Sequence, residues 1–411
     1  MFFKRNITEK LQKALTRSPV VLLTGARQTG KSTLVKKLTS KEKFSNYVSF
    51  DDLRYLSAAK SDPIGFLSNI EKPTILDEVQ RVPEIFLSIK NYIDQNRIPG
   101  TFILTGSANP LLIPTLGDSL AGRMEIVKLY PLSVGEIIGT KESFIDLIFD
   151  GKIQQLKATK INKETIFKKL ILGGYPPVQN LDQEGVDAWF NSYLETILQR
   201  DVKDLAKIEG LTQLPNLLNL IATRVGGLLN IAELSRSSGI SNSTLHRYLT
   251  LLETLYLITF IQPWSTNLGK RFVKSSKLYL IDCGILLHLV RCDEERLMND
   301  SQIFGRSFEN FIVTEILKQA TWCRNQAKIY HYRTQSGNEV DLILEDKSGR
   351  VFGIEIKSSE TITKDHFKGL SHLQETLKDK FVGGIVLYTG NEKIPFGNNL
   401  WAIPVNAMWE N

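Results

Sequence analysis

The chain has 411 residues, of which 42% are hydrophobic, 23% charged and 9% aromatic. This composition is typical of a globular protein with more than one domain, and it excludes a collagen, a coiled coil and a low-complexity disordered chain. Lysine and arginine number 51 against 44 aspartates and glutamates, and the resulting net charge of +7 permits a nucleic-acid partner without requiring one.

Two further features bear on the compartment. The three cysteines form no C-x-x-C pair, which argues against a disulfide framework or structural zinc and indicates a reducing environment. The N-terminal residues Met-Phe-Phe-Lys-Arg-Asn lack the apolar core of a signal peptide, and no apolar run approaches the roughly 20 residues of a membrane span. We therefore expect a cytoplasmic protein without a membrane partner.

Short apolar runs alternate with helical spacing over the first 148 residues. Strands are predicted at residues 20–23, 47–50, 74–76, 101–104 and 125–129. This alternation predicts an α/β fold with a parallel, doubly wound sheet. Polar residues follow most of these strands, and they are expected at the carboxyl edge of the sheet, where sheets of this type bind ligands.

The pattern changes three times in the rest of the chain. A mostly helical stretch is followed by a unit of three helices and two strands, and then by a helix, three strands, a helix and a strand. The predicted parts are residues 1–148, 149–210, 211–290 and 291–411.

Residues 25–32 match the phosphate-binding pattern G-x-x-x-x-G-K-[ST] in full. A predicted buried strand precedes them and a helix follows, which is the context in which backbone amides bind phosphate. Lys31 is expected to reach the β- and γ-phosphates, and the Ser32 hydroxyl to bind Mg²⁺. The predicted cofactors are therefore ATP and Mg²⁺. The residues expected to contact them are Gly25, Ala26, Arg27, Gln28, Thr29, Gly30, Lys31, Ser32 and Thr33.

Two acidic residues follow the predicted strand 74–76. Asp77 is expected to hold Mg²⁺ together with Ser32, and Glu78 is expected to orient and polarise the attacking water. Ser107 ends the strand that lies between the two halves of this site, so it is expected to contact the water or the γ-phosphate, with a strand-end capping role as the alternative.

An arginine is also needed to neutralise the charge that develops at the γ-phosphate. Arg123, which precedes the fifth predicted strand, is the first candidate for this role. Arg27, inside the phosphate loop, is the second.

Several of these motifs resemble a bacterial and archaeal family of AAA-type P-loop ATPases whose C-terminal region is classed as a domain of unknown function. The resemblance implies an additional-strand ATPase core, and it says little about biological role. That family often has Asn at the position of Ser107. The segments that carry the resemblance are 25–33, 76–78, 104–107, 129–133, 173–176, 193–201 and 277–284.

Residues 230–249 fit a helix-turn-helix, with Ala232 and Leu234 expected to face inward, Gly239 in the turn and Ser241 as the N-cap of the second helix. Residues of types that reach bases or phosphates follow the cap, and a basic loop is placed to act as a wing. DNA contact and use as a protein-binding module remain alternatives. The residues expected on the exposed side are Asn242, Ser243, Thr244, His246 and Arg247, and the loop carries Lys270, Arg271, Lys274 and Lys277.

The last predicted part contains Asp341, then Glu355 and Lys357 on one face of the next strand. This spacing, followed by a helix and a strand, resembles the PD-(D/E)XK nuclease core. Asp341 and Glu355 are expected to converge on one Mg²⁺ with Lys357 beside the attacking water, and Glu309 is expected to be a further ligand or an orienting group. An amphipathic hairpin, or a nuclease-like fold that no longer cuts, are the alternatives.

The sequence thus predicts an AAA-type P-loop ATPase, a helical connector, a winged helix-turn-helix and a restriction-endonuclease-like domain. Coupling of ATP hydrolysis to DNA binding or cleavage is the first functional hypothesis. The alternatives are a nucleotide-dependent switch that binds a partner protein and a DNA-tethered regulator with an inactive nuclease-like scaffold. The sequence leaves open whether the chain forms a homo-oligomer.

Overall fold

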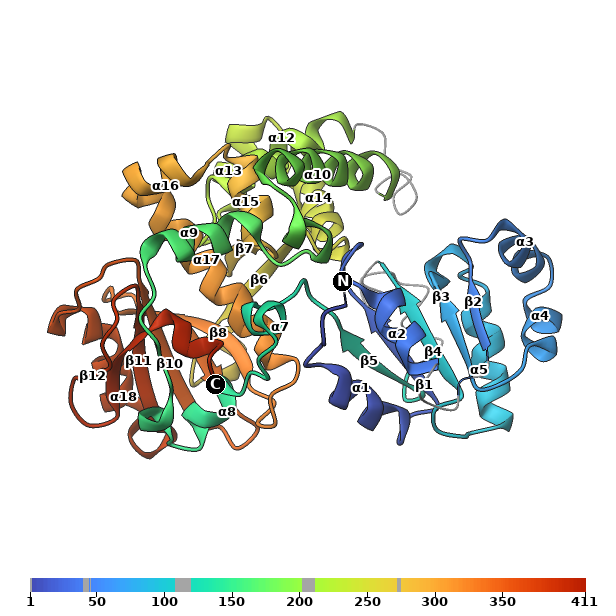
Figure 1. Ribbon diagram of the computed structural model, residues 1–411, viewed down its shortest axis with the longest axis horizontal. Helices are drawn as coiled ribbons and strands as arrows, with labels where there is room; N and C mark the ends of the chain where they lie inside the picture. Colours follow the sequence, from blue (N-terminus) through green and yellow to red (C-terminus); the bar gives the residue numbers. More distant parts are fainter. Residues whose placement is uncertain (1, 40–43, 45, 108–119, 202–210, 272–274) are drawn as a thin grey trace. The chain divides into compact units, whose positions relative to one another are not determined.

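The computed structural model describes the chain except for residues 1, 40–43, 45, 108–119, 202–210 and 272–274 (Figure 1). Its contacts divide it into two compact units. The N-terminal unit comprises Arg5–Pro131 together with Thr250–Leu257, and the C-terminal unit comprises Met1–Lys4, Leu132–Leu249 and Ile258–Asn411.

The N-terminal unit is built on a five-stranded sheet in which all neighbouring strands are parallel. The strands are β1 (Val20–Thr24), β2 (Asn46–Ser49), β3 (Thr74–Asp77), β4 (Phe102–Gly106) and β5 (Met124–Lys128). Their spatial order is β2-β3-β4-β1-β5. Because β4 lies between β1 and β3, the additional-strand arrangement implied by the resemblance is confirmed, and the strand that ends near Ser107 separates the two halves of the phosphate site.

Helices cover this sheet. They are α1 (Thr8–Leu15), α2 (Lys31–Thr39), α3 (Leu53–Ser61), α4 (Pro63–Asn69) and α5 (Ile85–Gln95). All five residues of β1 are buried, as expected for a parallel strand with both faces covered. The core on one side joins Leu22 and Leu104 of the sheet to Ile89 of α5.

The C-terminal unit is mostly helical before residue 257. Its helices, including those that follow in the sequence, are α7 (Val134–Ile138), α8 (Phe144–Phe149), α9 (Lys163–Leu172), α10 (Gln183–Thr196), α12 (Leu214–Ala222), α13 (Ile231–Ser238), α14 (Asn242–Thr254), α15 (Cys283–Leu289), α16 (Glu294–Asn299), α17 (Ser301–Ala320) and α18 (Lys368–Leu377). Helix α14 begins in this unit, and its residues from Thr250 onward belong to the N-terminal unit.

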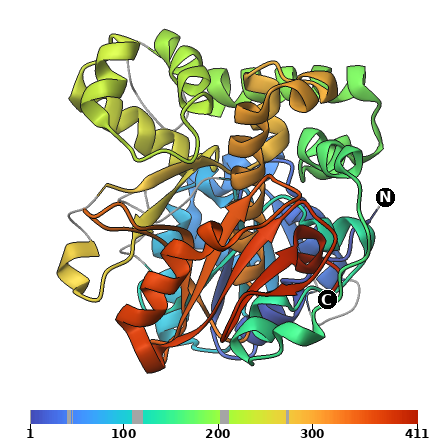
Figure 2. The same cartoon turned by 90° about the vertical axis from the view of Figure 1, so that its left-hand side faces the viewer.

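The same unit contains an eight-stranded mixed sheet in the order β12-β13-β11-β10-β9-β8-β6-β7. The strands are β6 (Ile258–Pro263), β7 (Lys277–Leu280), β8 (Lys328–Arg333), β9 (Glu339–Glu345), β10 (Val351–Lys357), β11 (Phe381–Tyr388), β12 (Ile394–Pro395) and β13 (Leu400–Pro404). Strand β9 is antiparallel to its neighbours β8 and β10, whereas β10, β11 and β13 run parallel. Helix α18 packs against β9, β10 and β11 (Figure 2).

One expected domain boundary cuts through this sheet. The hairpin β6/β7 was assigned to residues 211–290, and β8 to residues 291–411, yet β6 pairs in parallel with β8 at Gln262↔Tyr330 and Pro263↔His331. A buried ion pair strengthens the junction, because Arg271 donates to both carboxylate oxygens of Glu345 at 2.6 and 3.0 Å. The two parts therefore share one sheet, which the local sequence pattern does not reveal.

None of the described helices has both the length and the apolar character that a bilayer-crossing segment requires.

Candidate functional site

The phosphate loop lies between β1 and α2, as the motif predicts. A side chain at Gly25 would collide with the carbonyl oxygen of Leu129, so only glycine fits this start of the loop. The Leu129 amide in turn donates to the carbonyl of Thr24 at 2.7 Å. The residue after β5 is thus packed directly against the entrance of the loop.

Lys31 points back into the loop. Its side chain is buried, and its ammonium donates to the carbonyl oxygens of Gly25 and Ala26 at 2.9 and 2.8 Å. Arg5, which is also buried, donates to the carbonyl of Thr29 at 2.7 Å and holds the other side of the loop. The cationic Lys31 head group therefore lies among the backbone groups that surround an anion in loops of this kind.

Ser32 and Asp77, 45 positions apart, are hydrogen-bonded at 3.1 Å. Two more hydroxyls donate to the buried Asp77 carboxylate, that of Tyr47 at 2.5 Å and that of Thr105. Burial raises the pKa of Tyr47 well above its usual value, and the Asp77 charge raises it further. The structure thus brings together the predicted metal pair and surrounds it with hydroxyl donors.

Glu78 follows Asp77 in a left-handed backbone conformation, with φ of 59°. Its amide donates to the Thr105 hydroxyl at 3.2 Å. The Gln80 side-chain amide donates to the Glu78 carboxylate and, at 2.9 Å, to the Ser107 hydroxyl. Gln80 therefore links the residue expected to polarise water to the residue expected to sense the nucleotide.

The other predicted loop residues differ in how far they are exposed. Thr29 is fully buried and donates to the Ala26 carbonyl at 2.9 Å, whereas Gln28 and Thr33 are exposed. Arg27 is partly buried inside the loop.

Arg123 does not lie near the phosphate loop. It precedes β5, whose first residue Met124 is in register with Val20, at the opposite end of β1 from the loop. Its guanidinium instead pairs with Asp94 at 2.5 Å. Because the two ends of a five-residue strand are about 13 Å apart, Arg123 cannot neutralise a phosphate bound in its own chain's loop.

The residues at this site fit Mg²⁺. Ser32 and Asp77 offer a hydroxyl and a carboxylate oxygen, the hard oxygen ligands that Mg²⁺ prefers, close to the loop lysine. Ser32 and Asp77 would hold the ion there, and it would supply positive charge that neutralises the phosphates. The protein's own part is to hold the Asp77 carboxylate in place through the hydroxyls of Ser32, Tyr47 and Thr105.

The helix-turn-helix expected at residues 230–249 is formed by α13 and α14 around Gly239. Ser241 caps α14 by accepting from the Thr244 amide at 3.4 Å. Leu234 is buried as expected and Ile240 is buried too, whereas Ala232 is exposed. Asn242, Ser243, His246 and Arg247 lie on the exposed side of α14, and Thr244 is partly buried.

The proposed wing is only partly described. Lys274 lies outside the described residues, as does the side chain of Lys270. Arg271 and Lys277 are buried in ion pairs, so neither presents a free charge to a nucleic acid.

The three residues of the nuclease-like motif do converge. Asp341 lies on β9 beside β10, where its Oδ2 accepts from the Ile356 amide at 2.9 Å. Glu355 is buried, and its Oε1 accepts from the Lys357 ammonium at 2.6 Å. Burial, together with the Asp341 charge, raises the pKa of Glu355 to about 8.

A residue absent from the motif lies at the centre of this group. The Lys277 ammonium is 3.2 Å from Glu309, 3.0 Å from Glu339 and 3.3 Å from Asp341. Tyr279 also donates to Glu309, at 2.7 Å. Burial alone would lower the pKa of Lys277, but the surrounding carboxylates outweigh it and raise that pKa above its usual value. The expected ligands Glu309 and Asp341 therefore lie around the Lys277 ammonium, Glu355 pairs with the Lys357 ammonium, and the residues present do not fit a metal ion.

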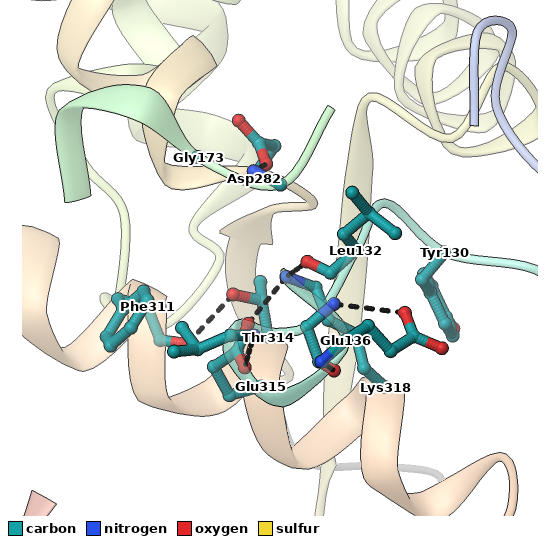
Figure 3. Close-up of polar contacts among 12 residues, drawn as sticks. Tyr130, Leu132, Glu136, Gly173, Asp282, Phe311, Thr314, Glu315 and Lys318 are labelled. Atoms are coloured by element: carbon teal, nitrogen blue, oxygen red, sulfur yellow. Dashed lines mark hydrogen bonds and ion pairs between the residues drawn. The ribbon is translucent and has the colours of Figure 1, made fainter. Parts of the chain in front are cut away.

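A second cluster of buried charged residues contacts Leu132, the first residue after the N-terminal segment Arg5–Pro131 (Figure 3). The Lys318 ammonium donates to the Leu132 carbonyl at 2.9 Å and to Glu315 at 2.6 Å. A side chain at Gly174 would collide with the same Leu132 carbonyl, and the Gly174 amide donates to Asp282 at 2.7 Å. Three segments of the family resemblance thus meet at one place.

Sequence reasoning missed several residues of these sites. Tyr47, Gln80 and Lys277 carry no motif of their own, and each acts on residues far away in the sequence or on the far side of a turn. Lys277 was assigned to a wing because it follows a basic loop. Its position in a predicted buried strand was the available signal, since a lysine there must have an anionic partner.

Comparison with known protein families gives matches to three successive parts of the chain. The family model described as AAA domain matches residues 17–138. Two models described as Domain of unknown function, DUF8612 and DUF4143, match residues 163–296 and 304–408. The AAA match covers the sheet and the phosphate loop described above, so the N-terminal unit is an AAA-type P-loop ATPase domain, as the resemblance predicted.

Similar solved structures include the Walker-type ATPase paby2304 of Pyrococcus abyssi, with 14% identity, a TM-score of 0.42, and 70% of this chain and 96% of that chain covered. The RuvB Holliday junction branch migration motor of Thermotoga maritima is 20% identical, with a TM-score of 0.30 and coverage of 63% and 90%.

Curated relatives extend over more of the chain. An uncharacterized protein of Haemophilus influenzae is 23% identical over 339 residues, 78% of this chain and 79% of that protein. Uncharacterized protein Rv2008c of Mycobacterium tuberculosis is 30% identical over 409 residues, 98% of this chain and 84% of its own length. With this identity along nearly its whole length, the chain belongs to the same family as the mycobacterial protein, a family whose N-terminal unit is an AAA domain.

Proposed function

We propose that the chain is a Mg²⁺-dependent ATPase that couples ATP turnover to DNA binding through the α13/α14 helix-turn-helix. The observation that carries the ATPase part is the hydrogen bond between Ser32 and Asp77, with Glu78 next in the chain. In this proposal Lys31 binds the phosphates, Ser32 and Asp77 hold Mg²⁺, and Glu78 polarises the attacking water.

The exposed face of α14 supports DNA as the partner. Asn242, Ser243, His246 and Arg247 are the side chains that a recognition helix presents to bases and phosphates. A protein-binding role for the same helix is the competing hypothesis.

Helix α14 also supports coupling. The helix carries the candidate DNA residues at its start, and its last residues belong to the N-terminal unit. Just beyond it, the Tyr256 hydroxyl lies 3.0 Å from the Thr24 hydroxyl, and Thr24 is the last residue before the phosphate loop. A change at the loop and a change at the DNA face would therefore act on one continuous segment, α14 and the residues that follow it.

Phosphate release tests the proposal directly. Duplex DNA is expected to raise ATP turnover of the wild-type chain. Lys31→Ala is expected to abolish turnover and retain DNA binding, whereas Arg247→Ala should retain basal turnover and lose the DNA response. Exposed Lys37 on the same helix as Lys31 provides the matched control, since Lys37→Ala should behave as wild type. Absence of ATP turnover under all conditions refutes the ATPase part of the proposal. ATP turnover without any DNA binding refutes the DNA part and favours the protein-binding role of the helix-turn-helix.

Cleavage of DNA by the C-terminal unit is not part of the proposal. Metal-dependent cleavage requires a divalent cation beside Asp341 and Glu355, and each of these carboxylates is paired with an ammonium, Asp341 with Lys277 and Glu355 with Lys357.

A further inference from the structure

We propose that Lys277 is a built-in counter-ion that takes the place of a divalent cation in the nuclease-like site, so that this site is closed to metal and does not cut DNA. The site is the carboxylate cluster of Glu309, Glu339, Asp341 and Glu355. The inference concerns the C-terminal unit alone and does not depend on ATP hydrolysis.

The position of the ammonium is the first argument. An ammonium group has three hydrogens to donate. Three carboxylates from two elements lie around Lys277 at 3.0 to 3.3 Å, Glu309 from α17 and Glu339 and Asp341 from β9. One donor is available for each of these carboxylates, and the head group lies beside Asp341, one of the two residues that would hold the metal ion.

Other donors also contact this group, and one buried oxygen, Glu355 Oε2, has no hydrogen-bond partner among the described residues. Asp341 gives its second oxygen to the Ile356 amide, and Glu309 Oε1 accepts from Tyr279 as well as from Lys277. Glu355 pairs with Lys357 at 2.6 Å. A divalent ion entering this group would displace these donors and would lie beside two ammonium charges, which is unfavourable in a partly desolvated site.

Lys277 is held in place by its strand. All four residues of β7 are buried, and the Lys277 side chain is 4% exposed. Its backbone pairs with Ile261 of β6 and forms a bridge with Leu228. Withdrawal of the side chain would leave three carboxylates without their cation and would require the hairpin to open.

The proposed exclusion of a metal ion does not come from a lack of access to the carboxylate cluster. Glu309 lines a cavity of about 410 Å³ whose wall also contains Gly226, Arg306 and Leu278. An ion can therefore approach the cluster from solvent, and it is the occupied position that keeps it out.

Manganese binding to the full-length chain, measured by electron paramagnetic resonance without nucleotide, tests the inference. The wild type is expected to bind no Mn²⁺ that depends on Asp341. Lys277→Met, which keeps the apolar stem and removes the charge, is expected to gain an Mn²⁺ site at least about tenfold tighter than any in the wild type, because a like charge beside the ion is removed. The double variant Lys277→Met/Asp341→Asn is expected to lose it.

Two further variants make the test specific. Lys357→Met removes the neighbouring ammonium and leaves Lys277 in place, so no Mn²⁺ site is expected. Lys277→Gln keeps hydrogen bonding without the charge and serves if Lys277→Met does not fold. Mn²⁺ binding by the wild type that Asp341→Asn abolishes, or DNA cleavage by the wild type that Lys357→Ala abolishes, overturns the inference. Folded Lys277→Met or Lys277→Gln without any gained site also overturns it, because Lys277 would then not be the excluding group.

Discussion

The ammonium nitrogen of Lys277 lies 3.3 Å from a carboxylate oxygen of Asp341, although the two residues are 64 positions apart in the chain. Asp341 belongs to a motif that can be read in the sequence, and Lys277 does not. Their pairing joins β7 of the β6/β7 hairpin to β9 in the middle of the same sheet. A group of carboxylates that resembles a metal site is thereby converted into an internal ion cluster.

Tyr47→Phe is expected to weaken the response of ATP turnover to Mg²⁺. The Tyr47 hydroxyl donates to Asp77 at 2.5 Å. Its loss removes a group that holds in place the carboxylate that the metal requires. Partners of metal ligands commonly contribute about 10- to 100-fold to metal affinity, and we expect the half-saturating Mg²⁺ concentration to rise by about tenfold. Turnover measured across a Mg²⁺ titration checks this. Tyr55→Phe, at an exposed position on α3, is the control, and an unchanged titration of Tyr47→Phe would contradict the role of the hydroxyl.

Gln80→Leu is expected to lower kcat by about tenfold, a part of the 10²- to 10⁴-fold that a general base contributes. Gln80 holds the Glu78 carboxylate and the Ser107 hydroxyl at the same time. Binding of a fluorescent ATP analogue should remain unchanged, because Gln80 contacts none of the loop residues. Ser107→Ala is also expected to lower kcat, by less than Gln80→Leu does. If Gln80→Leu loses binding of the ATP analogue as well as kcat, Gln80 has a structural role instead.

Lys318→Met is expected to destabilise the C-terminal unit. The change leaves the buried Glu315 carboxylate without its cation and the Leu132 carbonyl without its donor. Breaking such a buried pair costs about 3–5 kcal/mol. Urea unfolding measures the loss, and adding Glu315→Gln should restore part of it. Lys368→Met, at an exposed pair with Asp365, should leave the free energy of unfolding unchanged.

Glu142→Gln is expected to change how stability depends on pH. Burial, with the charge of Glu315, raises the pKa of Glu142 to about 8 in the folded chain, above the ordinary value of 4.5. The folded state therefore binds more protons than the unfolded state between these values, and stability is lost as pH rises through this window.

The glutamine variant removes this contribution. Its free energy of unfolding relative to wild type should increase from pH 5 to pH 8, by at most about 1.4 kcal/mol per pH unit. Urea unfolding at several pH values measures this difference. A difference that stays constant with pH would show that Glu142 does not titrate in this range.

Arg247→Ala is expected to weaken DNA binding and to reduce its dependence on salt. Arg247 is exposed on α14, where a recognition helix approaches the phosphates. Loss of one phosphate contact lowers the slope of log K against log salt by about 1. Fluorescence anisotropy at several salt concentrations measures the slope, with Lys368→Ala as the control. Equal weakening in both variants would indicate binding by general charge alone.

Much of the N-terminal unit could be read from the sequence. Each of its five strands was predicted within two residues, because buried parallel strands are short apolar runs bounded by polar turns. The pairing of Ser32 with Asp77 followed from the same logic, since parallel strands carry their final residues to one edge. Arg123 precedes its predicted strand, so the same logic places it at the amino end, away from the phosphate loop, as the structure does.

The sequence by itself determined the phosphate loop, its acidic partners, the helix-turn-helix and the order of elements from α17 to β11, since each rests on local spacing, whereas α15, α16, β12 and β13 were not predicted. Only the tertiary structure decided that β6 and β7 join the C-terminal sheet, that Leu132, Gly174 and Lys318 meet, and that Lys277 lies among the carboxylates. These features depend on which distant strands and helices pack together. A buried charge must find an opposite charge wherever the fold brings one within reach, and that partner is not recorded in the spacing of neighbouring residues.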